Sequence, residues 1–78
     1  MKFTSTRSCQ DFTSAAAITR GIAADGGLFV PCCFPQMSFQ KLEELAEADY
    51  LTRACEVLKL YLTDYSDEEI AQCVNGAY

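Results

Sequence analysis

The sequence predicts a small α+β domain, in which a two-stranded β-ribbon is combined with about four short helices. Three observations predict this class. The first residues are β-branched and aromatic, an Asp-Gly-Gly turn precedes a second apolar run, and apolar residues recur at helical spacing after residue 38. At 78 residues the chain has room for one small hydrophobic core. We therefore expect a single domain that spans residues 1–78.

Two segments are predicted to form the ribbon. Residues 1–7 alternate roughly between apolar and polar side chains, which is typical of a short strand, whereas residues 8–12 are polar and are expected to form a loop. Residues 28–30 follow the turn as a brief apolar strand, which Pro31 should end because proline cannot donate to a ladder. The simplest arrangement pairs this second strand with the first.

A short helix is expected between the two strands. Thr13 and Ser14 can cap its start, the alanine-rich residues that follow favour helix, and Gly21 stands where a helix would stop. The spacing of Ile18 and Ile22 predicts that both side chains face one core.

Three further helices are predicted in the second half of the chain. Ser38 and Asp49 can cap the first two, and Ser66 with Glu69 matches a capping box at the start of the third. Each helix carries an apolar stripe. The stripes are Leu42, Leu45 and Ala46; then Leu51, Ala54, Cys55, Leu58, Tyr61 and Leu62; and finally Ile70, Cys73, Val74 and Ala77.

The cysteines give little support to a metal or redox protein. Five cysteines cannot pair completely within one chain, no C-x-x-C spacing occurs, and no histidine is present to complete a zinc site. We expect Cys55 and Cys73 to be small core residues and the others to be reduced thiols, which suits a cytoplasmic location. The five residues are Cys9, Cys32, Cys33, Cys55 and Cys73.

Charge and composition exclude several function classes. A formal net charge of −5 argues against nucleic-acid binding, and no apolar run is long enough for a signal peptide or a membrane span. Without histidine the usual proton shuttle is missing, so the chain does not resemble a complete enzyme. The acidic side chains of Glu43, Glu44, Glu47 and Asp49 are expected to form a solvated helix face, and those of Asp64, Asp67, Glu68 and Glu69 should supply helix-start charges. A stand-alone acidic module that binds a basic partner is one open interpretation.

Two polar motifs could bind an anion. Asp25, Gly26 and Gly27 form the sharpest turn signal, and Ser5, Thr6 and Arg7 combine two hydroxyls with a guanidinium. Neither motif matches a glycine-rich phosphate loop, so local chemistry alone favours a structural turn and an ordinary strand end.

Taken in order along the chain, however, these motifs resemble the N-terminal domain of the threonine synthase family. The resemblance covers essentially the whole chain, and its most specific segment is residues 21–31. Two positions differ from the family pattern. Ser8 stands where the family usually has glycine, and Ala24 stands where it often has proline. The matching pieces are residues 3–7, residues 21–31, Pro35, Asp49–Tyr50, Ala54 and Ala77–Tyr78.

The resemblance implies that a longer parent protein carries the chemistry. Threonine synthases are pyridoxal-phosphate-dependent lyases of threonine biosynthesis, which convert O-phospho-L-homoserine and water to L-threonine and phosphate. Their cofactor lysine lies in downstream catalytic domains. We therefore expect no catalytic, cofactor-binding or metal-binding residue here, since Lys41 and Lys59 read as helix-surface lysines.

The resemblance also suggests what this chain does in such a parent. Its partners would be the catalytic domains of the same chain, with no nucleic acid and no membrane, and an isolated domain would self-associate through its uncovered docking face. Arg7 could also reach toward the anionic substrate. The candidate docking or substrate-entrance residues are Ser5, Thr6, Arg7, Asp25, Gly26 and Gly27.

Overall fold

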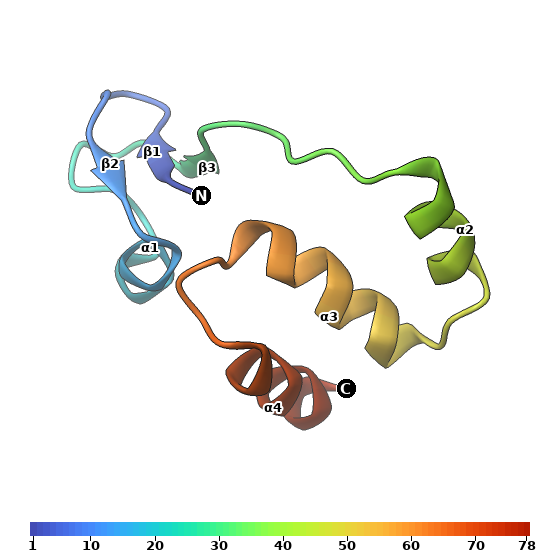
Figure 1. The fold of residues 1–78 in the computed structure, drawn as a ribbon. Helices are drawn as coiled ribbons and strands as arrows, with labels where there is room; N and C mark the ends of the chain where they lie inside the picture. The colour runs from blue at the N-terminus through green and yellow to red at the C-terminus, as the bar shows by residue number, and fades with distance from the viewer.

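The computed structural model describes all residues, 1–78, and confirms the α+β class (Figure 1). A small sheet and the first helix form one half of the molecule, and three helices form the other. The elements are β1 (Phe3–Ser5), β2 (Asp11–Phe12), α1 (Ser14–Arg20), β3 (Phe29–Pro31), α2 (Phe39–Ala46), α3 (Tyr50–Tyr61) and α4 (Asp67–Ala77).

The predicted two-stranded ribbon is a three-stranded antiparallel sheet with strand order β2-β1-β3. The pairing of β1 with β3 is confirmed, with Thr4 opposite Val30. The prediction that residues 8–12 form only a loop is wrong, because β2 pairs with the other edge of β1. Its Phe12 ring packs edge-on against Phe29, with ring centroids 5.1 Å apart, and this contact draws a polar segment into the sheet.

Helix α1 begins and ends where the sequence predicts. The Thr13 hydroxyl accepts a hydrogen bond from the Ala16 N–H, and Gly21 ends the helix with a φ of 77°. The predicted shared core of Ile18 and Ile22 is wrong, since the two residues are 59% and 64% exposed. The left-handed turn at Gly21 carries Ile22 away from the helix and into a bridge with Leu28.

All three predicted caps of the helical half are confirmed. Ser38 and Asp49 each accept a hydrogen bond from the third residue beyond, and Ser66 and Glu69 form a reciprocal capping box. The apolar stripes are only partly covered, because each helix has few neighbours. Leu45, Ile70 and Val74 are buried, Cys55 is half-buried, and Leu42, Cys73 and Ala77 are exposed, so the predicted core position of Cys73 is wrong.

The two halves meet at the loop between α3 and α4. Asp64 in that loop accepts hydrogen bonds from the Ser14 hydroxyl and from the Ala15 N–H at the start of α1. The amino group of Met1 donates to the Thr63 hydroxyl over 2.9 Å. These polar contacts tie the sheet to the helices where the apolar core is thin.

The result is an open shape for a chain of this length. The molecule measures 41 × 28 × 17 Å, and its radius of gyration is 14.0 Å, against about 11.5 Å expected for a compact domain. The accessible surface is 5536 Å², against about 4,700 Å² for a folded monomer of this mass. About 800 Å² therefore remains exposed beyond the ordinary amount. None of the helices is both long and apolar enough to span a bilayer.

Candidate functional site

The structure brings all six predicted site residues together at one end of the sheet. The Ser5 hydroxyl donates to Asp25 Oδ1 over 2.7 Å, and the Gly27 N–H donates to the same oxygen over 2.9 Å. The Arg7 N–H donates to Ser5 Oγ over 3.1 Å, and Ser5 is only 4% exposed. We call this hydrogen-bonded set, residues 5–7 with residues 25–27, the clasp.

The remaining members of the clasp join it to β3. The Thr6 N–H donates to the Leu28 carbonyl over 2.9 Å, and the Leu28 N–H donates back to the Thr6 hydroxyl over 3.0 Å. The Arg7 guanidinium donates to the Asp25 carbonyl over 3.3 Å and stays exposed. The two motifs that looked separate in the sequence are therefore one structural unit.

Both glycines of the turn are required by this geometry. Gly26 has a φ of 83°, which side chains rarely adopt. At Gly27 an added β-carbon would overlap Ser5 Oγ and would lie 2.9 Å from Thr6 Oγ1. A residue with a side chain could occupy the second position only if β1 moved away from the turn.

The clasp also fixes the charge of its carboxylate. The Ser5 hydrogen bond, followed by that of the Gly27 N–H, lowers the pKa of Asp25, and Arg7 adds a smaller effect. Asp25 is therefore charged at neutral pH and serves as a hydrogen-bond acceptor. A carboxylate held in this form is poorly suited to act as a general acid.

A polar hollow of about 200 Å³ lies beside the clasp. Arg20 and Gln10 contribute donors to its wall, whereas Asp25 contributes a negative charge that opposes an anionic ligand. The Ser5 hydroxyl already donates to Asp25. The hollow is therefore no preformed phosphate site. Its lining is Ser5, Ser8, Gln10, Phe12, Arg20, Ala23, Ala24 and Asp25.

The turn holds an exposed apolar surface in place. Ile22 and Leu28 face each other in an antiparallel bridge, and Val30 follows Leu28 at the strand period of two, so the three side chains share one face of the sheet. They are 64%, 63% and 37% exposed. We call Ile22, Leu28 and Val30 the outer sheet face. Sequence reasoning missed it, because it assigned Ile22 to the core.

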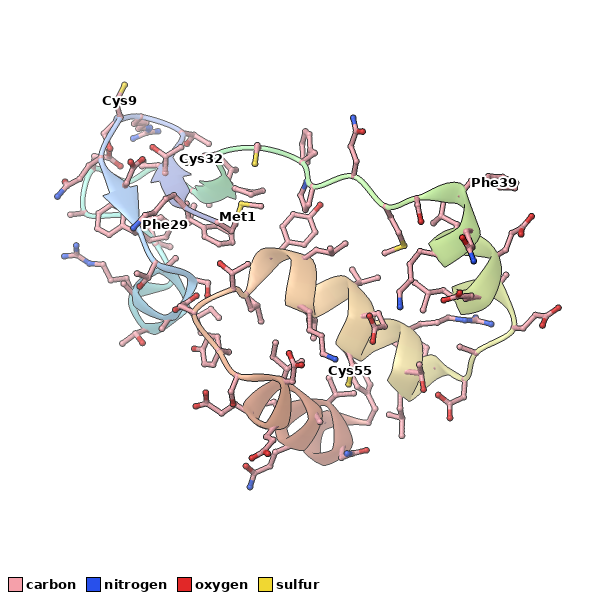
Figure 2. All side chains as sticks on the ribbon, in the orientation of Figure 1. Met1, Cys9, Phe29, Cys32, Phe39 and Cys55 are labelled. Atoms are coloured by element: carbon pink, nitrogen blue, oxygen red, sulfur yellow. The ribbon has the colours of Figure 1, made fainter.

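The cysteines do not gather into a site. Cys9 points away from the molecule at the turn between β1 and β2, while Cys32 lies at the end of β3 (Figure 2). All five cysteines are free, and the Cys32 sulfur is 3.8 Å from Asp11 Oδ1. No group of three or more histidine, cysteine, aspartate or glutamate side chains is placed to hold a metal ion.

The lysines do not fit a pyridoxal-phosphate site. Lys41 and Lys59 both form ion pairs with Glu56, at 3.2 and 3.5 Å, on the surface of the helical half. Lys2 is exposed beside β1, and no lysine lines any of the four hollows of the molecule. Both helix lysines are therefore already paired with a carboxylate.

The protein is a small α+β domain. In its most distinctive motif, the clasp, hydrogen bonds hold the turn of residues 25–27 against the end of β1. This chain belongs to a family that is described as threonine synthase N terminus, and the family model matches residues 2–78. The sequence resemblance to this family is thereby confirmed.

Several curated relatives agree with this assignment. Threonine synthase of Escherichia coli is 31% identical over 74% of this chain, that of Corynebacterium glutamicum is 37% identical over 74%, and that of Eremothecium gossypii is 35% identical over 97%. The chain spans between 13% and 16% of the length of these relatives.

Proposed function

We propose that this chain acts as the N-terminal domain of a threonine synthase, docked on the catalytic domains of the same protein. The whole enzyme would convert O-phospho-L-homoserine and water to L-threonine and phosphate. Pyridoxal phosphate, bound by a lysine of the catalytic domains, would supply the chemistry. Membership of the family and the small share of its relatives' length support this proposal.

The observation that carries the docking role is the exposed outer sheet face. Ile22, Leu28 and Val30 present apolar area on a sheet whose geometry the clasp fixes. Apolar patches that a protein leaves open commonly mark interaction surfaces. Because the turn is already ordered, docking would cost little conformational entropy. The clasp would thus act by presenting the docking surface, with Arg7 exposed at its edge.

A chimera tests this role. Residues 1–78 would replace the matching segment of Escherichia coli threonine synthase, in a strain that lacks its own enzyme. We expect growth without added threonine, and phosphate release from O-phospho-L-homoserine by the purified protein. A chimera that folds, binds pyridoxal phosphate and yet releases no phosphate would contradict the proposal.

Two variants of the chimera locate the docking surface. Ile22→Glu places a charge on the outer sheet face and should lower activity roughly tenfold or more. Phe34→Glu is the matched control, because Phe34 is 82% exposed and lies on the segment between β3 and α2, outside the strands. Equal activity of both variants would remove the outer sheet face from this role.

The distribution of charge supports a second candidate, a stand-alone acidic interaction module. Residues 32–78 carry three basic and nine acidic side chains, a net of −6, whereas residues 1–31 carry three basic and two acidic, a net of +1. A concentrated negative surface attracts basic partners. Sequencing the gene discriminates the two: a reading frame that runs on into a cofactor lysine favours the synthase, and a stop codon after Tyr78 favours the module.

A further inference from the structure

We propose that, when no catalytic domain covers it, the outer sheet face of one copy docks into the apolar groove between α2 and α3 of a second copy. This inference rests on the outer sheet face being the docking surface proposed above. The groove is a second surface, which lies on the helical half of the molecule, and the sheet face of another copy would fill it.

The groove is a preformed apolar hollow of about 510 Å³. Leu45 forms part of its floor and is buried, while Leu42 and Val57 are 51% and 44% exposed at its walls. Figure 1 shows the segment between β3 and α2 passing around this region as an open arch. The lining residues are Met37, Leu42, Leu45, Ala46, Arg53 and Val57.

The one charged group of the lining is already engaged. Arg53 donates through Nε to the Leu45 carbonyl over 2.7 Å and through Nη2 to the Ala46 carbonyl over 2.8 Å. It thereby satisfies backbone carbonyls at the end of α2 and holds α2 against α3. The groove therefore offers an ordered apolar surface, and its guanidinium needs no further anionic partner.

The open shape of the molecule leaves enough surface for a contact between copies. Each copy exposes about 800 Å² more than a compact monomer of its mass. A standard protein interface buries about 800 Å² on each partner. Phe39, at the first turn of α2, is 75% exposed and points away from the body of the molecule (Figure 2), so it lies outside the groove.

Charge decides which surfaces meet. Placing two grooves face to face would bring together two halves that each carry a net charge of −6. Placing the sheet half of one copy, with a net charge of +1, against the helical half of another avoids this repulsion. Charge therefore disfavours a groove-to-groove contact and favours a contact of sheet face with groove.

A mixing experiment tests this pairing with two neutral variants of the 78-residue chain. Ile22→Gln removes apolar area from the outer sheet face, and Val57→Gln removes it from the groove. Both side chains are partly exposed, so the fold should survive, and circular dichroism and melting curves would check this. Sedimentation velocity should show self-association of the wild type, weakened roughly tenfold or more in each variant alone.

The equimolar mixture of the two variants is the decisive sample. The intact groove of Ile22→Gln should accept the intact sheet face of Val57→Gln, so a one-to-one pair should form although each variant pairs only weakly with itself. Added sodium chloride should weaken the pair, because unlike charges favour it.

Two outcomes would overturn the inference. One is a wild-type chain that stays monomeric up to about 1 mM, the range of the weakest specific contacts. The other is a mixture that associates no better than its separate components. Neither outcome affects the proposed function, since activity of the chimera requires no second copy. An inactive chimera with a self-associating chain would instead reject the proposed function alone.

Discussion

Asp64 and Ser14 join the two halves of the molecule. The Ser14 hydroxyl, 1% exposed at the start of α1, donates to the Asp64 carboxylate in the loop between α3 and α4, fifty residues away along the chain. The second oxygen of Asp64 accepts from the Ala15 N–H over 2.9 Å. A side chain expected to supply charge at the start of α4 thus satisfies donors at the start of α1.

Replacing Asp64 with alanine should therefore loosen the joint. The variant would leave the Ser14 hydroxyl buried without an acceptor, at a cost of about 1–3 kcal/mol in the free energy of unfolding. Hydrogen exchange should accelerate for the amides of α1 more than for those of α4. Asp67→Ala is the matched control, because its side chain is 80% exposed in a 3.9 Å ion pair and should change stability little. Equal effects of the two substitutions would contradict this account of the joint.

The clasp predicts a penalty at Gly27. A Gly27→Ala methyl would overlap Ser5 Oγ, a short side chain that cannot swing clear without losing its hydrogen bond to Asp25. We expect overpacking to lower the free energy of unfolding by about 1–3 kcal/mol, measured by urea titration.

Gly76→Ala supplies a control of opposite sign. Gly76 lies in α4 with nothing near its missing β-carbon, so alanine should stabilise the chain by about 0.5–1 kcal/mol. If Gly27→Ala left the free energy of unfolding unchanged while Gly76→Ala raised it, the turn would not pack tightly against β1.

Stability should depend on pH in the acid range because four carboxylates have lowered pKa values, and two of them, Asp25 and Asp64, join distant segments of the chain. A hydrogen bond from Ser5 is the largest cause at Asp25, and one from Ser14 is the largest at Asp64. Each carboxylate stabilises the fold above the ordinary aspartate pKa of about 4, and this contribution is lost as the pH falls through the lowered folded-state value.

Thermal melting between pH 6 and acid should reveal this loss. The melting temperature should be level near neutral pH and should fall below about pH 4. Asp25→Asn should flatten part of that fall. Asp49→Asn removes a carboxylate of lowered pKa outside the clasp and should flatten a separate part. A melting temperature that rises on acidification would be incompatible with these pKa directions.

Arg7 is predicted to contribute little to folding. Its guanidinium is exposed and makes a 3.3 Å hydrogen bond to the Asp25 carbonyl, so Arg7→Ala should change the free energy of unfolding by no more than about 0.5 kcal/mol. In the chimera, a raised KM for O-phospho-L-homoserine with unchanged stability would support a role at the substrate entrance. Unchanged KM and kcat would leave Arg7 without a functional role.

Local signals predicted most of the elements. Helix caps and stops depend on short-range hydrogen bonds and backbone preferences, so they can be predicted from neighbouring residues. This is why the caps at Ser38, Asp49 and Ser66 and the helix end at Gly21 were predicted. Strand β2 was not predicted. Its two residues are held by pairing with β1 and by the contact of Phe12 with the Phe29 ring, and neither is visible in the local sequence.

The role of the six candidate residues as a docking or entrance surface stays a prediction, and the structure shows only how they lie. Six residues were expected to share a surface, and they are joined in the clasp, but local chemistry could not show that the two motifs bond to each other. The exposure of Ile22 was missed, because helical spacing was assumed to continue past Gly21. The joint of Asp64 with Ser14 links residues too distant in sequence for any local pattern to connect.

Hydroxyl-radical footprinting tests the central claim, that the outer sheet face docks on the catalytic domains, most directly. Oxidation rates of Ile22, Leu28 and Val30 would be compared between the chimera and a dilute, monomeric sample of the 78-residue chain, with buried Val74 as the low reference. We predict strong protection of the three side chains in the chimera, down toward the rate of Val74. Equal oxidation of all three in both proteins would contradict the docking assignment.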